Sequence, residues 1–385
     1  MVSQGWRTAL LLAQLALLGC AGPAEKAPPP ERIARDAADV VDPREIVTLV
    51  PDPGAADRLA AAATRRGYAL ARRSRLGALG FDQLVFRMPA DRDGPEAIAE
   101  IEALEASATA GLNHAYRLQA GAAGAGRVYA DRLLGWAEDG CPARVPIGMI
   151  DGPVDAAAPS LARARIDQKD FTGGPAGARH GTAVAEILAG PGRLSGAVIH
   201  SAAVVSDRED PEGAAGVDTL MLALDWLARS GVELVNVSLA GPYNKILDQG
   251  VRAADRRGMI LVAAAGNTGA DGPPRYPAAF PRTIAVTAID AAARPYAEAP
   301  RGDHIDFAAP GVDIYLRLEG PGEYLSGTSL AAPYVTALLA GARLPRSAGA
   351  ARDALAAEAR DLGADGRDEV FGAGLPRPAP ACRRG

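Results

Sequence analysis

The chain has 385 residues, which is enough for one large domain and a smaller module. Apolar residues make up 48% of the sequence and charged residues 23%, as in ordinary globular proteins, and the net charge is −5. This mild acidity comes without a basic stripe, so the sequence argues against nucleic acid as a partner.

The first twenty residues predict a targeting segment. Arg7 precedes an apolar run at 9–19 that is short for a bilayer span. The run ends in "LLGC", which resembles a bacterial lipobox and implies lipidation of Cys20. Two alternatives remain open, namely an ordinary signal-peptidase cut after Ala21 and an uncleaved anchor. All three place the rest of the chain in the cell envelope, lipid-anchored in the periplasm or at the outer membrane, or outside the cell.

A tether and a small folded unit follow. Residues 21–44 are polar and proline-rich and predict a disordered tether. Residues 45–120 have the order βαββαβ, which is typical of a small α+β ferredoxin-like domain. The expected strands are 45–50, 68–76, 81–88 and 110–119, and the expected helices are 54–67 and 94–106. Small residues at 120–127 mark the domain boundary, so 121–143 is expected to hold a linker and the start of the next domain.

The main domain is expected at 144–385. Near-continuous apolar runs of strand length alternate there with helical stretches, which predicts an α/β domain with a parallel sheet flanked by helices. The expected strands are 144–151, 196–205, 232–239, 259–266 and 283–290, and the expected helices are 181–189, 217–230, 245–257, 329–341 and 348–360. Ligands of such sheets bind beyond the carboxyl ends of the strands.

Four polar residues fall near that edge. Asp151 and Asn267 follow apolar strands, and His180 and Ser329 stand at the starts of apolar helices. Each alone has an ordinary explanation as a turn former or a helix cap. Together they supply the parts of a nucleophilic site, because a serine hydroxyl needs a base such as histidine, and a carboxylate can orient that base.

These residues lie in motifs that resemble those of the subtilisin-like serine peptidases. The matching pieces are "IGMID", "HGTAVAEILAG", "NVSLAG", "AAAGN", "YPAAFPRTIAVTA", "FAAPG" and "SGTSLAAP", and the resemblance covers about 144–376. It implies a triad of Asp151, His180 and Ser329, in the order that subtilisin itself has. It also implies that the Asn267 amide and the Ser329 backbone N–H stabilise an oxyanion.

The same resemblance implies a serine endopeptidase that needs no cofactor and acts on polypeptide substrates. Substrate would lie along 238–241 as an added strand, and 264–266 would help to line the pocket for the side chain before the cut. The expected binding residues are Ser238, Leu239, Ala240, Gly241, Ala264, Ala265 and Gly266. Because they are mostly small and apolar, they indicate a preference for hydrophobic or small side chains. Calcium often binds in this family, but no acidic loop here is specific enough to assign a metal site.

The sequence departs from the family pattern at several positions. The residues that follow Asp151 are "GPVD", and Pro153 stiffens a turn where the family usually has serine or threonine and then glycine. None of the departures removes a triad atom. The others are Glu186, Ala240, Leu330 and Tyr334. We expect Asp151, and not Asp155, to orient His180, because Asp151 ends the strand.

By the same resemblance, residues 45–120 look like an inhibitory propeptide of a self-processing precursor, with an unrelated α+β binding module as the alternative. Export makes a disulfide between Cys141 and Cys382 chemically allowed, and two unpaired thiols are the alternative.

Two other functions are weighed against a peptidase. The first is a pseudoenzyme that keeps the fold and binds peptides without cutting them, supported only by the "DGP" turn. The second is a metallohydrolase, against which the sequence shows no HExxH or comparable ligand cluster.

Overall fold

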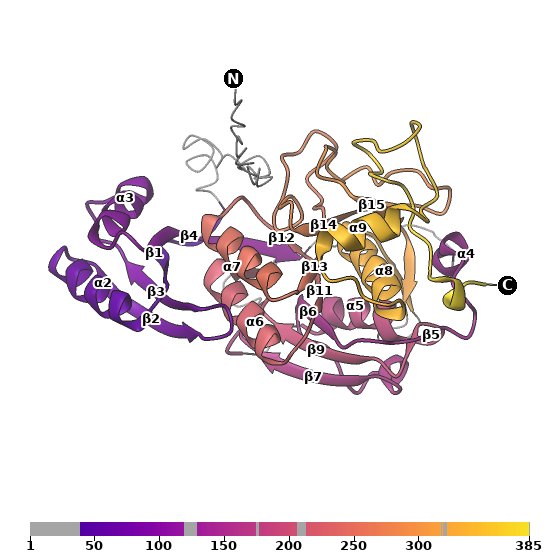
Figure 1. The fold of residues 1–385 in the computed structure, drawn as a ribbon, viewed down its shortest axis with the longest axis horizontal. Coiled ribbons are helices and arrows are strands. Elements are labelled where there is room, and N and C mark those ends of the chain that lie inside the picture. Colours follow the sequence, from indigo (N-terminus) through magenta and orange to yellow (C-terminus); the bar gives the residue numbers. More distant parts are fainter. Residues whose placement is uncertain are drawn as a thin grey trace, which may run out of the picture.

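The structure is a computed structural model that describes residues 39–118, 129–174, 177–205, 213–316, 318 and 322–384. The expected leader with Cys20, most of the tether and the small-residue boundary at 120–127 lie outside the described residues. Two units are seen in Figure 1, a smaller N-terminal one in indigo and purple and a larger one that holds the other described residues.

The N-terminal unit has the βαββαβ order expected from the sequence. Its sheet order is β4-β1-β3-β2, with every pair antiparallel. Asp52 and Asp93 cap the two helices, and each helix has proline in its first turn. The elements are β1 (Val40–Val50), α2 (Pro53–Arg65), β2 (Ala69–Leu76), β3 (Phe81–Arg87), α3 (Gly94–Leu104) and β4 (Thr109–Leu118).

The larger unit is built on a seven-stranded parallel sheet, in the order β15-β14-β13-β11-β6-β9-β7. Its central strands are buried on both faces, as their continuous apolar runs predict. The strands of this sheet are β6 (Ile147–Asp151), β7 (Arg165–Asp170), β9 (Val198–Ala203), β11 (Leu234–Val237), β13 (Ile260–Ala264), β14 (Thr283–Ile289) and β15 (Phe307–Pro310).

Helices cover both faces of this sheet (Figure 1). One core includes α5 (Arg179–Ala189), α8 (Thr328–Gly341) and α9 (Ala348–Ala356), and the core on the other face includes α6 (Val217–Arg229) and α7 (Lys245–Arg256). The predicted α/β fold class is therefore confirmed. The shorter elements are α4 (Ala130–Leu134), β5 (Cys141–Pro142), η2 (Pro159–Leu161), β8 (Leu194–Ser195), β10 (Ala214–Gly216), β12 (Leu239–Ala240), β16 (Ile314–Leu316), β17 (Glu323–Leu325) and η3 (Pro380–Cys382).

The sequence predicts five strands for the large sheet and misses both of its edge strands, β7 and β15. The sequence of β7 is "RIDQKD", and most of its residues are exposed, so it has no apolar run that would reveal it. The sequence of β15 is "FAAP", which is buried but has only four residues. Edge strands have a single neighbour, so they need fewer apolar residues than the strands at the centre.

The last strand of the N-terminal unit is held by the larger unit. Strand β4 pairs antiparallel with β10 through Ala115–Arg117 and with β12 through Arg117 and Leu118. Tyr116 is fully buried in this strand, and its hydroxyl donates a hydrogen bond of 3.1 Å to the carbonyl of Pro242. One sheet therefore runs across both units.

Charged contacts add to this junction. Arg72 donates to both oxygens of Glu45, at 2.9 and 2.8 Å, and to Asp218 of α6 at 2.8 Å. Asp225 of α6 is buried and accepts the backbone N–H groups of Ala78 and Leu79. Such charge-assisted bonds are stronger than neutral ones, so they help to fix the orientation of the two units.

A buried histidine lies at the same junction. His114 of β4 is 2% exposed, and its Nδ1 lies 2.8 Å from Nδ2 of Asn244. The Asn244 Oδ1 caps α7 by accepting from the N–H of Ile246 at 2.8 Å, so its Nδ2 is the donor and His114 Nδ1 must accept. His114 is therefore neutral, and burial lowers its pKa to about 4.

Acid should loosen this junction. In the docked state the pKa of His114 is about 4, whereas an undocked histidine takes up a proton near its ordinary pKa of about 6.5. Docking is therefore strongest above pH 6.5 and weakens as the pH falls. Between pH 7.5 and 5.5 the undocked population should rise about tenfold. Amide hydrogen exchange in the β4–β10 ladder, corrected for the intrinsic pH dependence, measures this opening.

The control is His114→Asn, because an asparagine oxygen can accept from Asn244 but does not titrate in this range. His200→Asn, on β9 of the large sheet, should leave the pH effect in place. An equal pH response in His114→Asn contradicts the assignment. The other charged and titratable groups around His114 are Asp39, Arg275, Lys245, Glu102 and Tyr243.

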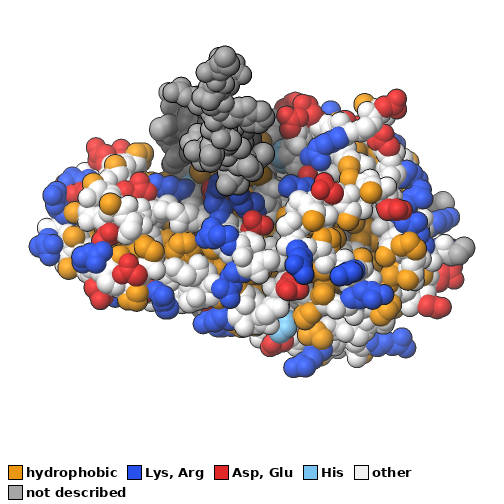
Figure 2. Space-filling view, in the orientation of Figure 1, with side chains coloured by type: hydrophobic (Ala, Val, Ile, Leu, Met, Phe, Trp, Pro, Cys, Tyr) orange, Lys and Arg blue, Asp and Glu red, His pale blue; other side chains and the backbone are white. Residues whose placement is uncertain are grey.

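Within the described ranges, no helix is long and apolar enough to cross a membrane. In Figure 2, side chains of both charge signs are interspersed over the face in view.

Candidate active site

The ends of three elements meet at the carboxyl edge of the large sheet. Asp151 is the last residue of the inner strand β6, His180 is the second residue of α5, and Ser329 is the second residue of α8. Helices α5 and α8 pack against the same face of the sheet. The strand fixes the position of the carboxylate, and the two first helical turns bring the imidazole and the hydroxyl to it.

The three side chains form one line of hydrogen bonds. His180 Nδ1 lies 2.7 Å from Asp151 Oδ1, and His180 Nε2 lies 3.0 Å from Ser329 Oγ. A carboxylate only accepts, so Nδ1 is the donor and the neutral ring is left with Nε2 as an acceptor for the serine hydroxyl. Asp151 and Ser329 are fully buried, and the His180 side chain is 10% exposed. In this geometry the imidazole can take the serine proton.

Asp155 has different partners. Its backbone N–H donates to Thr182 Oγ1 at 2.8 Å, and its carboxylate accepts from the N–H of Ala157 at 3.0 Å. Asp151, by contrast, accepts from His180 and from the N–H of Gly152, both at 2.7 Å. The "DGP" turn therefore leaves Asp151 at the end of the strand.

Two further hydroxyls hold the turn that presents Ser329. Ser326 Oγ accepts the backbone N–H of Asp313 at 2.8 Å. Thr328 Oγ1 lies 3.0 Å from Asn267 Oδ1 and accepts the N–H of Gly266 at 3.1 Å. The turn is thus tied on one side to the loop after β15 and on the other to the loop after β13.

Asn267 is oriented by the start of α8. Its Oδ1 accepts the backbone N–H of Thr328 at 3.1 Å as well as the Thr328 hydroxyl. The amide oxygen therefore already accepts two hydrogen bonds, and the Nδ2 hydrogens are the donors of the amide. The Ser329 N–H lies in the first turn of α8, where helix N–H groups have no partner within the helix. The sequence predicts the Asn267 amide and the Ser329 N–H as the two oxyanion donors. In the structure, both residues lie at the start of α8.

Pro333 lies inside α8, beyond its first turn, because the helix begins at Thr328. Its missing N–H would have bonded to the carbonyl of Ser329, four residues earlier. Ser238 replaces that bond, since its buried hydroxyl donates to this carbonyl at 3.2 Å. Asn236 in turn donates to Ser238 at 2.8 Å. In the structure, therefore, the side chain of Ser238 bonds to the first turn of α8 and makes up for the N–H that Pro333 lacks.

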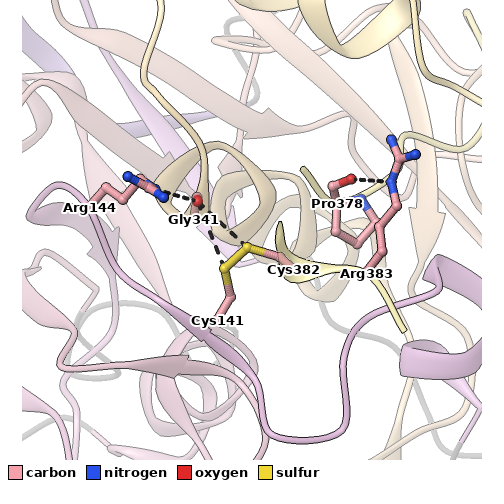
Figure 3. Close-up of a disulfide and its surroundings, with 6 residues drawn as sticks. All are labelled: Cys141, Arg144, Gly341, Pro378, Cys382 and Arg383. Atoms are coloured by element: carbon pink, nitrogen blue, oxygen red, sulfur yellow. Dashed lines mark hydrogen bonds between the residues drawn. A yellow bond between two sulfur atoms is a disulfide. The ribbon is translucent and has the colours of Figure 1, made fainter. Parts of the chain in front are cut away.

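The far end of α8 rests on a disulfide. Cys141 and Cys382 are bonded, with their Cα atoms 5.2 Å apart, and both lie against Gly341, the last residue of the helix (Figure 3). Arg144 donates from Nε to the Gly341 carbonyl at 3.1 Å, where a cation suits the negative end of the helix dipole. The helix that carries Ser329 is thus fixed at both ends.

The segment expected to bind substrate, 238–241, already pairs with a strand of the N-terminal unit. Leu239 and Ala240 form β12, which lies beside β4, so residues of the N-terminal unit occupy the place of an added strand. Gly241 lies against the ring of Tyr116. Leu239, Ala240, Ala264 and Ala265 are fully or almost fully buried. The structure thus brings 238–241 and 264–266 together beside Ser329.

Sequence reasoning missed two contributors to this region. The first is Thr328, which joins Asn267 to α8. The second is Arg275. A Cβ placed on Gly266 would lie 2.9 Å from Arg275 Cγ and 3.8 Å from Ala240 Cβ, so this arginine packs beside the expected pocket. The only signal for it was its place next to "YPAAFP".

Among the residues that the structure describes, no group of three or more His, Cys, Asp or Glu side chains is arranged to hold a metal ion.

Comparison with known proteins gives the family. The model of the subtilase family, Peptidase_S8, matches residues 145–374. A subtilisin from Bacillus pumilus is 32% identical over 203 residues, which cover 50% of this chain and 74% of that protein. The minor extracellular protease Epr of Bacillus subtilis is 35% identical over 176 residues, 43% of this chain and 26% of Epr. The chain belongs to the subtilase family.

The likeness extends to a solved structure. Fervidolysin from Fervidobacterium pennivorans, described as a keratinolytic enzyme related to subtilisin, superposes with a TM-score of 0.70 at 20% identity. The match covers 86% of this chain and 60% of fervidolysin, and it shows a common fold. The chain spans 26% of Epr and 53% of subtilisin E, so it matches only part of these relatives.

Proposed function

We propose that this protein is a serine endopeptidase that hydrolyses peptide bonds through Asp151, His180 and Ser329. The observation that carries the proposal is the unbroken hydrogen-bonded line from Asp151 through His180 to Ser329. Membership of the subtilase family supports it.

In the proposed reaction, His180 Nε2 takes the proton of Ser329 Oγ as that oxygen attacks the substrate carbonyl carbon. Asp151 stabilises the resulting imidazolium through Nδ1 and keeps the ring in place. The Asn267 Nδ2 hydrogens and the Ser329 N–H donate to the oxyanion. His180 then gives its proton to the leaving amine, which leaves an acyl-enzyme. Water, with His180 again as the base, releases the acid and restores Ser329.

The N-terminal unit acts as the inhibitor in this proposal. Strand β4 already pairs with β10 and β12, so it covers the place where a substrate strand would bind. The linker at 120–127 would enter the site, and self-cleavage there would convert the precursor into a complex of two pieces. Protonation of His114 at acidic pH would then release the N-terminal unit and favour the active form.

Export is part of the same proposal. The similarity to Epr, an extracellular protease, supports it, as does the disulfide between Cys141 and Cys382. Lipidation of Cys20 would anchor the precursor at the envelope, on the N-terminal side of the inhibitor.

Ser329→Ala and His180→Ala should each reduce peptide hydrolysis by about 10⁶-fold, because either change removes the attacking group or its base. Asn267→Ala should reduce turnover on the order of 10²–10³-fold, through loss of one oxyanion donor. Initial rates on a fluorogenic peptide give these values, and circular dichroism checks the fold.

The two variants Asp151→Asn and Asp155→Asn test which carboxylate orients His180. The first should reduce turnover by about 10⁴-fold, and the second should have little effect, since Asp155 does not contact His180. Substantial activity in Ser329→Ala contradicts the proposed function, and the reverse order in the aspartate pair contradicts the role of Asp151.

Maturation and release from the membrane should be one event. Cells that express the wild type should yield a shorter soluble form that begins near residues 120–128, whereas Ser329→Ala should stay full length in the membrane fraction. Fractionation followed by N-terminal sequencing distinguishes the two forms. An active wild-type protein that stays uncut and membrane-bound would make residues 45–120 a permanent domain instead of a removable inhibitor.

A further inference from the structure

Strand β4 brings one large side chain to the edge where a substrate strand would bind. Tyr116 is fully buried, and it lies two residues before Leu118, which pairs with Leu239 of β12. Arg117, between them, pairs with β10 as well as with β12, so β4 lies between these two strands of the large unit. A strand that is held on both edges has a fixed register, which determines where its side chains lie.

The ring of Tyr116 lies over a residue that has no side chain. A Cβ placed on Gly241, which follows β12, would lie 2.4 Å from Cδ1 and 2.6 Å from Cε1 of this ring, and 2.9 Å from the carbonyl oxygen of Ala115. All three atoms belong to β4. Gly241 does not have a positive φ, so its backbone conformation does not require glycine. The missing side chain instead leaves the space that the aromatic ring fills.

The far end of the ring reaches a polar atom of the large unit. The Tyr116 hydroxyl donates a hydrogen bond of 3.1 Å to the carbonyl of Pro242, and this contact is buried. Among the described residues, no other hydrogen bond to that carbonyl is formed. A buried carbonyl without a donor is costly, so the hydroxyl matters to this contact as well as the ring. A phenylalanine ring of the same size would leave the Pro242 oxygen unpaired.

We infer that the mature peptidase has a subsite that prefers tyrosine to phenylalanine, at the substrate residue two positions before the one that pairs with Leu239. The inference rests on the proposed function, in which a substrate strand takes the place of β4 after the N-terminal unit leaves. A tyrosine in this register covers Gly241 and donates to Pro242, as Tyr116 does in the precursor. A site that accepts a hydrogen bond from a hydroxyl discriminates against the analogue that lacks it, even when both rings fit.

The test uses the full-length wild-type chain after self-processing and three fluorogenic peptides that copy residues 113–124, with tyrosine, phenylalanine or alanine in the place of Tyr116. Mass spectrometry locates the bond that is cut in the tyrosine peptide, and kcat/KM is compared for that bond. The tyrosine peptide should exceed the phenylalanine peptide about 10-fold, as one buried hydrogen bond predicts. It should exceed the alanine peptide on the order of 100-fold, since the buried ring is lost as well.

Gly241→Ala places a methyl group where the ring lies, so it should reduce the ratio of the tyrosine rate to the alanine rate about 10-fold. Gly349→Ala is the matched control, because a Cβ on Gly349 of α9 comes no nearer than 4.0 Å to any atom outside the backbone of its own helix. It should keep the wild-type ratios.

A wild-type enzyme that cleaves the phenylalanine peptide as fast as the tyrosine peptide contradicts the inference and leaves the peptidase function standing. So does a Gly241→Ala variant that keeps the wild-type ratios. The rates of the wild type decide the question even where Gly241→Ala fails to fold. A wild type that cleaves none of the three peptides contradicts the proposed function, and the subsite with it.

Discussion

The hydrogen bond between Asp151 and His180 joins the end of the inner strand β6 to the first turn of α5. It forms because parallel strands end at one edge and the helices that follow begin near it. The 3.0 Å contact from His180 to Ser329 then brings in the start of α8. The remaining contacts around the site serve mainly to keep this helix in place. Thr328 ties it to Asn267, Ser238 replaces the bond that Pro333 cannot make, and the disulfide supports its far end.

The second constraint is the pairing of the short strands β10 and β12. Strands β10 and β12 are short and need a partner for their backbone groups. In the structure that partner is β4, which the N-terminal unit supplies. In the proposed function the same edge would serve a substrate strand, so inhibition and substrate binding would use one set of backbone hydrogen bonds. Release of the unit would then depend on the side chains around the ladder. Among them, protonation of His114 in acid would weaken docking, and Arg275 would lose its ion pair with Asp39.

Much of this arrangement is visible in the sequence because it rests on local patterns. Continuous apolar runs predict the central strands, and the "HGT" and "SGTS" motifs mark the starts of α5 and α8. The edge strands β7 and β15 were missed, since one is polar and the other very short. The pairing of β4 with β10 and β12 depends on contacts between residues about 100 positions apart, which no local pattern records. Arg275 was missed for the same reason, because its ion-pair partner is Asp39, 236 residues earlier.

The central claim is that His180 activates Ser329 as a nucleophile. A fluorophosphonate probe tests it directly, because the probe reacts with activated serines and its site can be mapped by mass spectrometry. The account predicts that the self-processed wild type is labelled at Ser329, and that His180→Ala, although folded, is labelled far more slowly. A processed wild-type protein that does not react, or a His180→Ala variant that reacts at the wild-type rate, would contradict it.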